Sequence, residues 1–141
     1  MIERLVGTWK LVSAVREEIP SGAKTKLFGE RPHGILNYSP DGRMIALIAR
    51  GDRKAAANGR PTTAEAEALY RSMLSYAGAY TVDGDVVTHD VELSWNESYT
   101  GSKQQRHMAF EGDRLILFTP QTPDPIDGRM SVRRMTWEKV A

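Results

Sequence analysis

Val87-Thr88-His89-Asp90-Val91-Glu92-Leu93 is the stretch that decides the fold class. Its odd-numbered positions are apolar except for one histidine, and its even-numbered positions are polar. Alternation with a period of two is typical of a β-strand that has one buried and one solvent-exposed face. The pattern therefore predicts a strand whose buried face carries a single titratable group, His89.

Turn signals place further hairpins on both sides of this strand. Asp83-Gly84 is typical of a two-residue type I′ turn, and Pro40-Asp41-Gly42 fits a type I turn followed by a glycine bulge. Gly112-Asp113 marks a third hairpin. Counting outward from these turns gives the expected cross-strand pairs: Tyr80 with Val87, Gly78 with His89, Tyr38 with Met44, Leu36 with Ala46, Gly34 with Ile48, Phe110 with Leu115, Met108 with Leu117, and Arg106 with Thr119.

The two ends of the chain supply the first and last strands. Residues 5–15 alternate, and the last strand is expected over residues 130–139, long enough to pair with the first. Short strands separated by tight turns indicate a sandwich or a barrel, and an inward histidine favours the barrel. The face of the first strand that carries Trp9 is expected to include Leu11, Ser13, Val15 and Glu17.

One segment breaks the strand pattern. Thr62-Thr63-Ala64-Glu65 matches a capping box, apolar residues at helical spacing follow, and Gly78 is placed to end a helix. We therefore expect one helix between Thr62 and Ala77, preceded by a polar and mobile loop over residues 51–61. The side chains expected to lie over one opening of the barrel are Leu69, Tyr70, Met73 and Tyr76.

Composition excludes several classes of protein. The chain has 141 residues, which fits a single domain over residues 1–141, and no cysteine, which excludes disulfides and thiolate chemistry. Nineteen basic against 18 acidic residues give a net charge of +1, which does not suggest a nucleic acid or a membrane surface as partner. No apolar run approaches the roughly 20 residues of a membrane span. Because the N-terminus lacks a signal-peptide pattern, we expect a cytoplasmic protein.

Several motifs occur in order along nearly the whole chain: Gly7-Thr8-Trp9, Tyr38-Ser39-Pro40-Asp41-Gly42-Arg43-Met44, Gly78-Ala79-Tyr80, Val87-Thr88-His89, Gln104-Gln105-Arg106 and Gly112-Asp113-Arg114-Leu115. This series resembles the lipocalin-like domain family of bacteria and fungi. The resemblance implies an all-β fold, an eight-stranded up-and-down antiparallel lipocalin-like barrel of the calycin type with one helix between strands 3 and 4. Most members have no established activity, so the resemblance informs the fold more than the function.

The resemblance also implies how one end of the barrel is closed. In lipocalins the tryptophan of the first strand plugs that end and an arginine of the last strand covers it. Trp9 and Arg134 would take these parts here, with Arg133 as the competing choice.

Two inward side chains could carry chemistry. His89 could contact a ligand or titrate near neutral pH, or it could be a core histidine bonded to a tyrosine or a carboxylate. Arg106 requires an anionic partner, which is either a ligand or Glu17. The positive charge of Arg106 is expected to lower the pKa of His89.

Metal and cofactor sites have little support in the sequence. His33 and His107 face outward on the hairpin count, and one remaining histidine cannot build a zinc site. Haem held by His89 alone is not expected. The sequence has no Gly-x-Ser-x-Gly elbow, no phosphate loop and no dinucleotide fingerprint. We expect neither a metal nor a cofactor.

Two functions stay open, besides a purely structural role. The first is binding of a small, largely apolar molecule with a polar or anionic head group inside the barrel. The second is a cyclase or isomerase that uses His89 as acid or base in the same cavity. The expected partner is a small molecule, with no nucleic acid and no membrane, and a homodimer stays open. The expected ligand-binding residues are His89, Arg106, Gln104, Tyr38, Met44, Tyr80, Met108 and Glu17.

Overall fold

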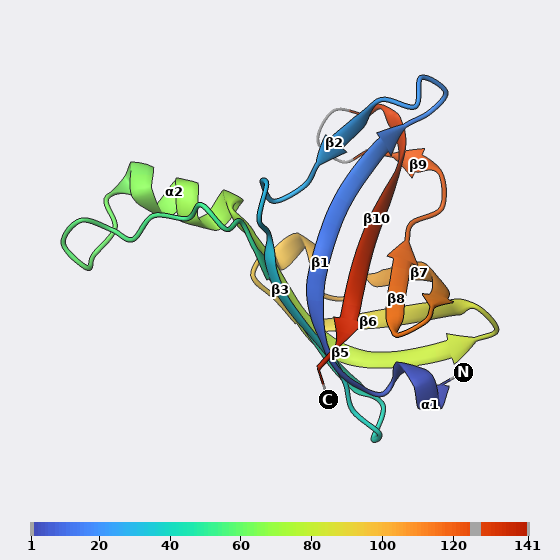
Figure 1. Ribbon diagram of the computed structural model, residues 1–141. Helices are drawn as coiled ribbons and strands as arrows, with labels where there is room; N and C mark the ends of the chain where they lie inside the picture. Colours follow the sequence, from blue (N-terminus) through green and yellow to red (C-terminus); the bar gives the residue numbers. More distant parts are fainter. Residues whose placement is uncertain (1, 125–127, 141) are drawn as a thin grey trace.

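The computed structural model describes residues 2–124 and 128–140, which form an antiparallel barrel closed by the pairing of the first and last long strands, β1 and β10 (Figure 1). The predicted all-β fold with eight barrel strands is confirmed. The short strands β2 (Lys24–Lys26) and β9 (Thr122–Pro123) pair alongside β1 and β10, respectively, at one end of the barrel. The barrel strands are β1 (Gly7–Glu18), β3 (His33–Tyr38), β4 (Arg43–Ala49), β5 (Met73–Asp83), β6 (Val86–Ser94), β7 (Lys103–Glu111), β8 (Arg114–Phe118) and β10 (Met130–Lys139).

Two hairpins have the register that their turn residues predict. In β3–β4, Tyr38 pairs with Met44, Leu36 with Ala46 and Gly34 with Ile48. In β7–β8, Met108 pairs with Leu117 and Phe110 with Leu115. The sequence count also gives the correct inward faces. Arg106 and Phe110, on the inward face of β7, are half-buried. Ten further residues on the predicted inward faces are buried: Trp9, Leu36, Tyr38, Met44, Tyr80, Val87, His89, Val91, Met108 and Leu117.

The β5–β6 hairpin has a different register from the predicted one. Tyr80 pairs with His89 instead of Val87, because Asp83 still belongs to the strand and the turn is formed by Gly84 and Asp85. The displacement is two residues, so both strands keep the predicted faces toward the interior, since side chains alternate with a period of two.

Gly78 therefore does not lie opposite His89 and leaves no space beside the imidazole. It pairs with Val91, next to a bulge in the β5–β6 ladder. A Cβ atom at Gly78 would lie 1.8 Å from the carbonyl oxygen of Asp90. Glycine is required here because the two backbones approach each other closely.

A second bulge changes the face of β1. The pairing of β1 with β10 shifts between Leu11 and Ser13, and beyond the shift Ala14 is the buried residue. One extra residue exchanges the two faces of a strand. Glu17 therefore lies on the opposite face from Ala14 and Arg16, and the prediction that it extends the inward face of Trp9 is wrong.

The helix lies between the third and fourth barrel strands, β4 and β5, as predicted, but it is shorter than predicted and does not cover the barrel. The capping box is confirmed, since Thr62 Oγ1 accepts from the Glu65 backbone N–H and the Glu65 carboxylate accepts from that of Thr62. However, α2 spans Thr63–Arg71, and residues 73–77 begin β5. No residue of α2 is buried, and the helix projects away from the barrel (Figure 1). The prediction that it covers an opening is therefore wrong.

The short helix α1 (Ile2–Leu5) and Trp9 close one end of the barrel, which we call the base. Trp9 is buried, and its Nε1–H donates to the Leu5 carbonyl over 2.8 Å. The cation over its ring is Lys139, whose Nζ lies 4.7 Å from the ring centroid. The assignment of this part to Arg134 is wrong, because Arg134 is exposed and lies over the Phe118 ring on the outer surface.

The opposite end, which we call the mouth, lies where β2 and β9 pair with β1 and β10 (Figure 1). The short helix η1 (Glu97–Tyr99) contributes Tyr99 to the cleft at this end. The connection between β8 and β10 contains β9, and its residues 125–127 lie outside the described part of the chain. In the described part, no helix has the length and apolar character needed to cross a membrane.

Candidate functional site

His89 lies in the barrel interior between two tyrosines. Strand β6 directs it inward, where it is 2% exposed. Its Nε2 lies 2.6 Å from Tyr38 Oη on β3, and its Nδ1 lies 2.7 Å from Tyr76 Oη on β5. We call Tyr38, Tyr76 and His89 the tyrosine–histidine trio. Both nitrogens of the ring are therefore engaged, as expected for a core histidine bonded to tyrosine.

Burial keeps the trio uncharged. It lowers the pKa of His89 to about 3, and the positive charge of Arg106 contributes in the same direction. The predicted effect of Arg106 is thus confirmed, but desolvation is the larger cause. Burial also raises the pKa of Tyr76, and it raises the pKa of Tyr38 well above its ordinary value. All three side chains are neutral at pH 7.

A small cavity adjoins the trio inside the barrel. Its volume is about 50 Å³, which is far below the roughly 300–1,000 Å³ of a typical ligand pocket. Most of its wall is apolar, and its polar part includes two members of the trio. The lining residues are Leu36, Ala46, Ile48, Leu74, Tyr76, His89, Tyr99, Arg106, Leu117, Thr119, Arg133, Met135 and Trp137.

A larger cleft of about 510 Å³ lies at the mouth. Tyr99, Arg106, Thr119 and Arg133 line both the cleft and the cavity, so the two spaces share a wall. The cleft therefore leads toward the interior. The remaining residues that line it are polar or belong to the β8–β10 connection: Lys103, Gln104, Gln105, Pro120, Thr122, Pro123, Asp124 and Ser131.

Two further hollows lie on the outside of the barrel. One, of about 510 Å³, separates α2 from residues 50–55, and the other, of about 790 Å³, lies along residues 24–31 and 50–52. Both contain the Arg50–Asp52 pair, whose side chains are exposed. Neither hollow reaches the barrel interior, so neither bears on the site around His89.

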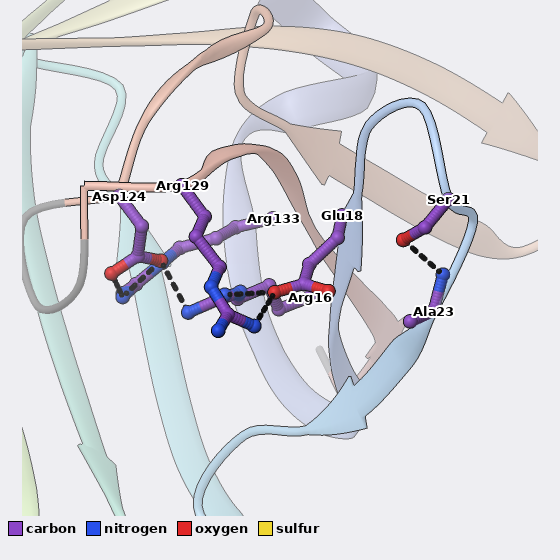
Figure 2. A network of polar contacts seen from close by, with 7 residues as sticks. All are labelled: Arg16, Glu18, Ser21, Ala23, Asp124, Arg129 and Arg133. Atoms are coloured by element: carbon purple, nitrogen blue, oxygen red, sulfur yellow. Dashed lines mark hydrogen bonds and ion pairs between the residues drawn. The ribbon is translucent and has the colours of Figure 1, made fainter.

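Charged side chains gather at the mouth in a network of ion pairs (Figure 2). The carboxylate of Asp124 is fully buried, and its Oδ2 lies 3.0 Å from Arg133 Nη2 and 3.4 Å from Arg16 Nη1. Arg16 and Arg129 each approach Glu18 Oε1 to 2.9 Å. We call these five residues the mouth network. Its three arginines and two carboxylates pair with one another, so each carboxylate contacts two guanidinium groups. Arg133 is the arginine of the Arg133–Arg134 pair that faces inward.

Arg106 lies between the trio and the mouth network and belongs to neither. Its Nη1 donates to the backbone carbonyl of Gln105 over 2.8 Å. Within the described residues it forms no ion pair, so of the two partners that the sequence left open, Glu17 is not the one that Arg106 contacts. It pairs across β6–β7 with Val87, while His89 pairs with Gln104. Arg106 thus presents a positive charge to both the cavity and the cleft.

The other predicted site residues are divided between two places. Gln104 lines the cleft, where its Nε2 donates to Ser102 Oγ over 2.9 Å. Met44, Tyr80 and Met108 are buried but line neither space. The Tyr80 hydroxyl instead donates to the backbone carbonyl of Ser39. The structure therefore brings His89, Arg106, Gln104 and Tyr38 near the two spaces, and it leaves the remaining predicted residues in the core or, for Glu17, on the other face.

Sequence reasoning missed several residues of the cavity wall. Tyr76 was expected on a helix, although Tyr76, Gly78 and Tyr80 also alternate as residues of one strand face do. Trp137 is 2% exposed, and its Nε1–H is buried without a hydrogen-bond partner among the described residues. The inward alternation of the last strand was the signal that could have identified Trp137.

The donor set favours binding over metal chemistry or acid–base catalysis. Among residues 2–124 and 128–140, no three histidine or carboxylate side chains gather as a metal site. His89 could serve as acid or base only after it gives up a hydrogen bond to a tyrosine, because both of its nitrogens are occupied.

Comparison with known proteins supports the fold and leaves the ligand open. A search of curated proteins returned no match. The model of a family described as a lipocalin-like domain matches residues 6–140, from the start of β1 to the end of β10. The match covers nearly the whole chain and agrees with the closed eight-stranded barrel and the buried Trp9 at its base. The chain therefore belongs to the lipocalin-like domain family.

Proposed function

We propose that the protein binds a small, largely apolar molecule with an anionic head group, and that Arg106 provides the positive charge for this head. The observation that carries the proposal is the position of Arg106. It lines both the cleft and the cavity, and no carboxylate of the described residues pairs with it. A partly enclosed guanidinium is stabilised by an anion, which it can contact through two hydrogen bonds.

The neighbouring cations already have partners. Arg133 is paired with the buried carboxylate of Asp124, and Lys103 is paired with Asp90 on the barrel wall. An anion that enters the cleft therefore gains most from Arg106. Gln104, on the same wall, adds an amide that can bond the head group.

The apolar part of the ligand lies further in. Leu36, Ile48, Leu74, Leu117 and Met135 form an aliphatic wall between the mouth and the trio. Burial of an apolar chain against such a wall contributes roughly 25 cal/mol per Å². The cavity is too small for this chain as it stands, so binding requires a side chain to move. Tyr99 is the group that we expect to move, because it lies on η1 and not on a strand and it lines both spaces.

The test compares decanoate with decanamide, which share one apolar chain and differ in the charge of the head. Isothermal titration of the wild type should show tighter binding of decanoate. Arg106→Met should weaken decanoate binding about 10-fold to 100-fold, because hydrogen bonds to charged groups contribute roughly 1.5–3 kcal/mol. Decanamide binding should change little.

Arg43→Met is the matched control. Arg43 is an exposed arginine that pairs with Glu92 on the outer surface, so its replacement should leave both affinities unchanged. An equal loss of both ligands in Arg106→Met, or no loss of either, would contradict the proposed role of Arg106.

A further inference from the structure

The hydrogen bonds of the trio determine where its protons lie. A neutral imidazole has one N–H donor and one acceptor nitrogen. Tyr38 is fully buried, and in the described part of the chain its hydroxyl contacts only His89 Nε2. If Nε2 carried the proton, the hydroxyl hydrogen of Tyr38 would have no acceptor. The other tautomer leaves the hydroxyl hydrogen of Tyr76 without an acceptor among the described residues, but Tyr76 lines the cavity, where a bound molecule can accept from it, and Tyr38 does not. We therefore assign the proton of the imidazole to Nδ1, with the Tyr38 O–H donating to Nε2.

The hydroxyl hydrogen of Tyr76 consequently has no acceptor in the described part of the chain. Its oxygen accepts from the Nδ1–H of His89, and the described residues offer its own hydrogen no other acceptor. Tyr76 lines the cavity, whereas Tyr38 does not. The chain of donation from Tyr38 through His89 to Tyr76 therefore ends in a donor on the cavity wall.

Trp137 supplies a second donor on the same wall. It lines the cavity, and its buried Nε1–H has no acceptor in the described part of the chain. The other two indole groups are satisfied, since Trp9 Nε1 donates to the Leu5 carbonyl and Trp95 Nε1 to the Tyr70 carbonyl. Buried N–H groups almost always have partners, so an exception inside a cavity points to an acceptor on a bound molecule.

We infer that Tyr76 and Trp137 form an inner subsite that binds a carbonyl-type oxygen of the ligand. The inference rests on the proposed function, because it assumes that a small molecule enters the barrel. It adds a specific requirement: the ligand carries a neutral acceptor oxygen within its apolar part, in addition to the anionic head at Arg106. Tyr38 and His89 are positioning residues, because they orient the Tyr76 hydroxyl and do not themselves bond the ligand oxygen.

The experiment compares acetophenone with ethylbenzene, which have nearly the same shape but differ in the carbonyl group. ¹H–¹⁵N spectra resolve the three indole groups of the chain, and Trp9 and Trp95 serve as internal references. Acetophenone should shift the Trp137 indole N–H downfield, and ethylbenzene should not. Both compounds should shift the methyl groups of Leu36 and Leu117 on the cavity wall.

Two variants examine the donor chain. Tyr76→Phe should reduce the preference for acetophenone about 2-fold to 10-fold, in the range of one neutral hydrogen bond. Tyr38→Phe should also reduce this preference, and the ¹⁵N shifts of His89 should show loss of the single Nδ1–H tautomer. Tyr80→Phe is the matched control, because this hydroxyl bonds the Ser39 carbonyl and lines neither space.

The outcomes separate this inference from the proposed function. Equal shifts of the cavity methyl groups by both compounds, with an unmoved Trp137 indole, would overturn the inner subsite and leave cavity binding intact. Failure of both compounds to perturb these methyl groups would also overturn the inference, and the decanoate titration then decides separately whether the proposed function holds.

Discussion

The trio and the mouth network place polar side chains inside the same barrel under opposite conditions. The trio is remote from water and carries no charge, because burial holds His89 neutral and both tyrosines protonated. The mouth network consists of charged side chains even though the carboxylate of Asp124 is fully buried, because Arg16 and Arg133 both pair with it. A partner of opposite charge, and not burial alone, thus decides whether a cluster inside the barrel is charged.

Arg106 is informative because it follows neither pattern. It keeps its charge without a carboxylate from the described residues, at the boundary between the two clusters. A group that the fold leaves uncompensated is the best candidate for ligand binding. The comparison between the two clusters therefore supports the proposed role of Arg106 as much as the cavity does.

The largest effect is expected from removing the central anion of the mouth network. Asp124→Asn should lower the free energy of unfolding by about 3 kcal/mol, since loss of one partner leaves buried charges uncompensated. Urea denaturation measures this loss. Glu30→Gln is the control, because Glu30 pairs with Lys26 at an exposed position and should contribute little. Similar stabilities of the two variants would show that the network carries no more than surface pairs do.

A smaller loss of stability is expected when the pH is lowered, because folding keeps His89 neutral. The pKa of His89 is about 3 in the folded protein, against 6.5 for an unperturbed histidine. Between these values the unfolded state binds more protons, so stability falls as the pH falls. From pH 7 to pH 5 the wild type should lose about 2 kcal/mol, measured by urea denaturation at each pH.

His89→Gln should remove most of this pH dependence. Glu18, in the mouth network, should not contribute in the same range, because its pKa is lowered from 4.5 by Arg129. An unchanged slope in His89→Gln would mean that His89 is not the neutral group that separates the two clusters.

The features that could be predicted from the sequence are the local ones. Pro40-Asp41-Gly42 and Gly112-Asp113 determine their hairpins because only a few loop geometries suit such residues. The position of His89 on the inner face also survives the error in the β5–β6 register, because a displacement of two residues preserves the face.

The features that were missed depend on tertiary pairing. The spacing of Met73, Leu74 and Tyr76 suits a helix as well as a strand, and pairing with β4 decides for the strand. The bulge after Leu11 contains no glycine or proline, so the sequence does not indicate it. The bulge nevertheless directs Arg16 inward and Glu17 outward. The place of Asp124 depends on its contacts with Arg129 and Arg133, which no local sequence pattern specifies.

The most direct test of the account is where decanoate binds, determined from methyl ¹H–¹³C spectra during a titration. We expect shifts of the methyl groups of Leu36, Ile48 and Leu117 on the cavity wall. The exposed Ile35 and Ile45 on the outer face of β3 and β4 serve as references and should not shift. Shifts confined to these outer residues, or no shifts at all, would contradict the claim that the barrel interior is a binding site.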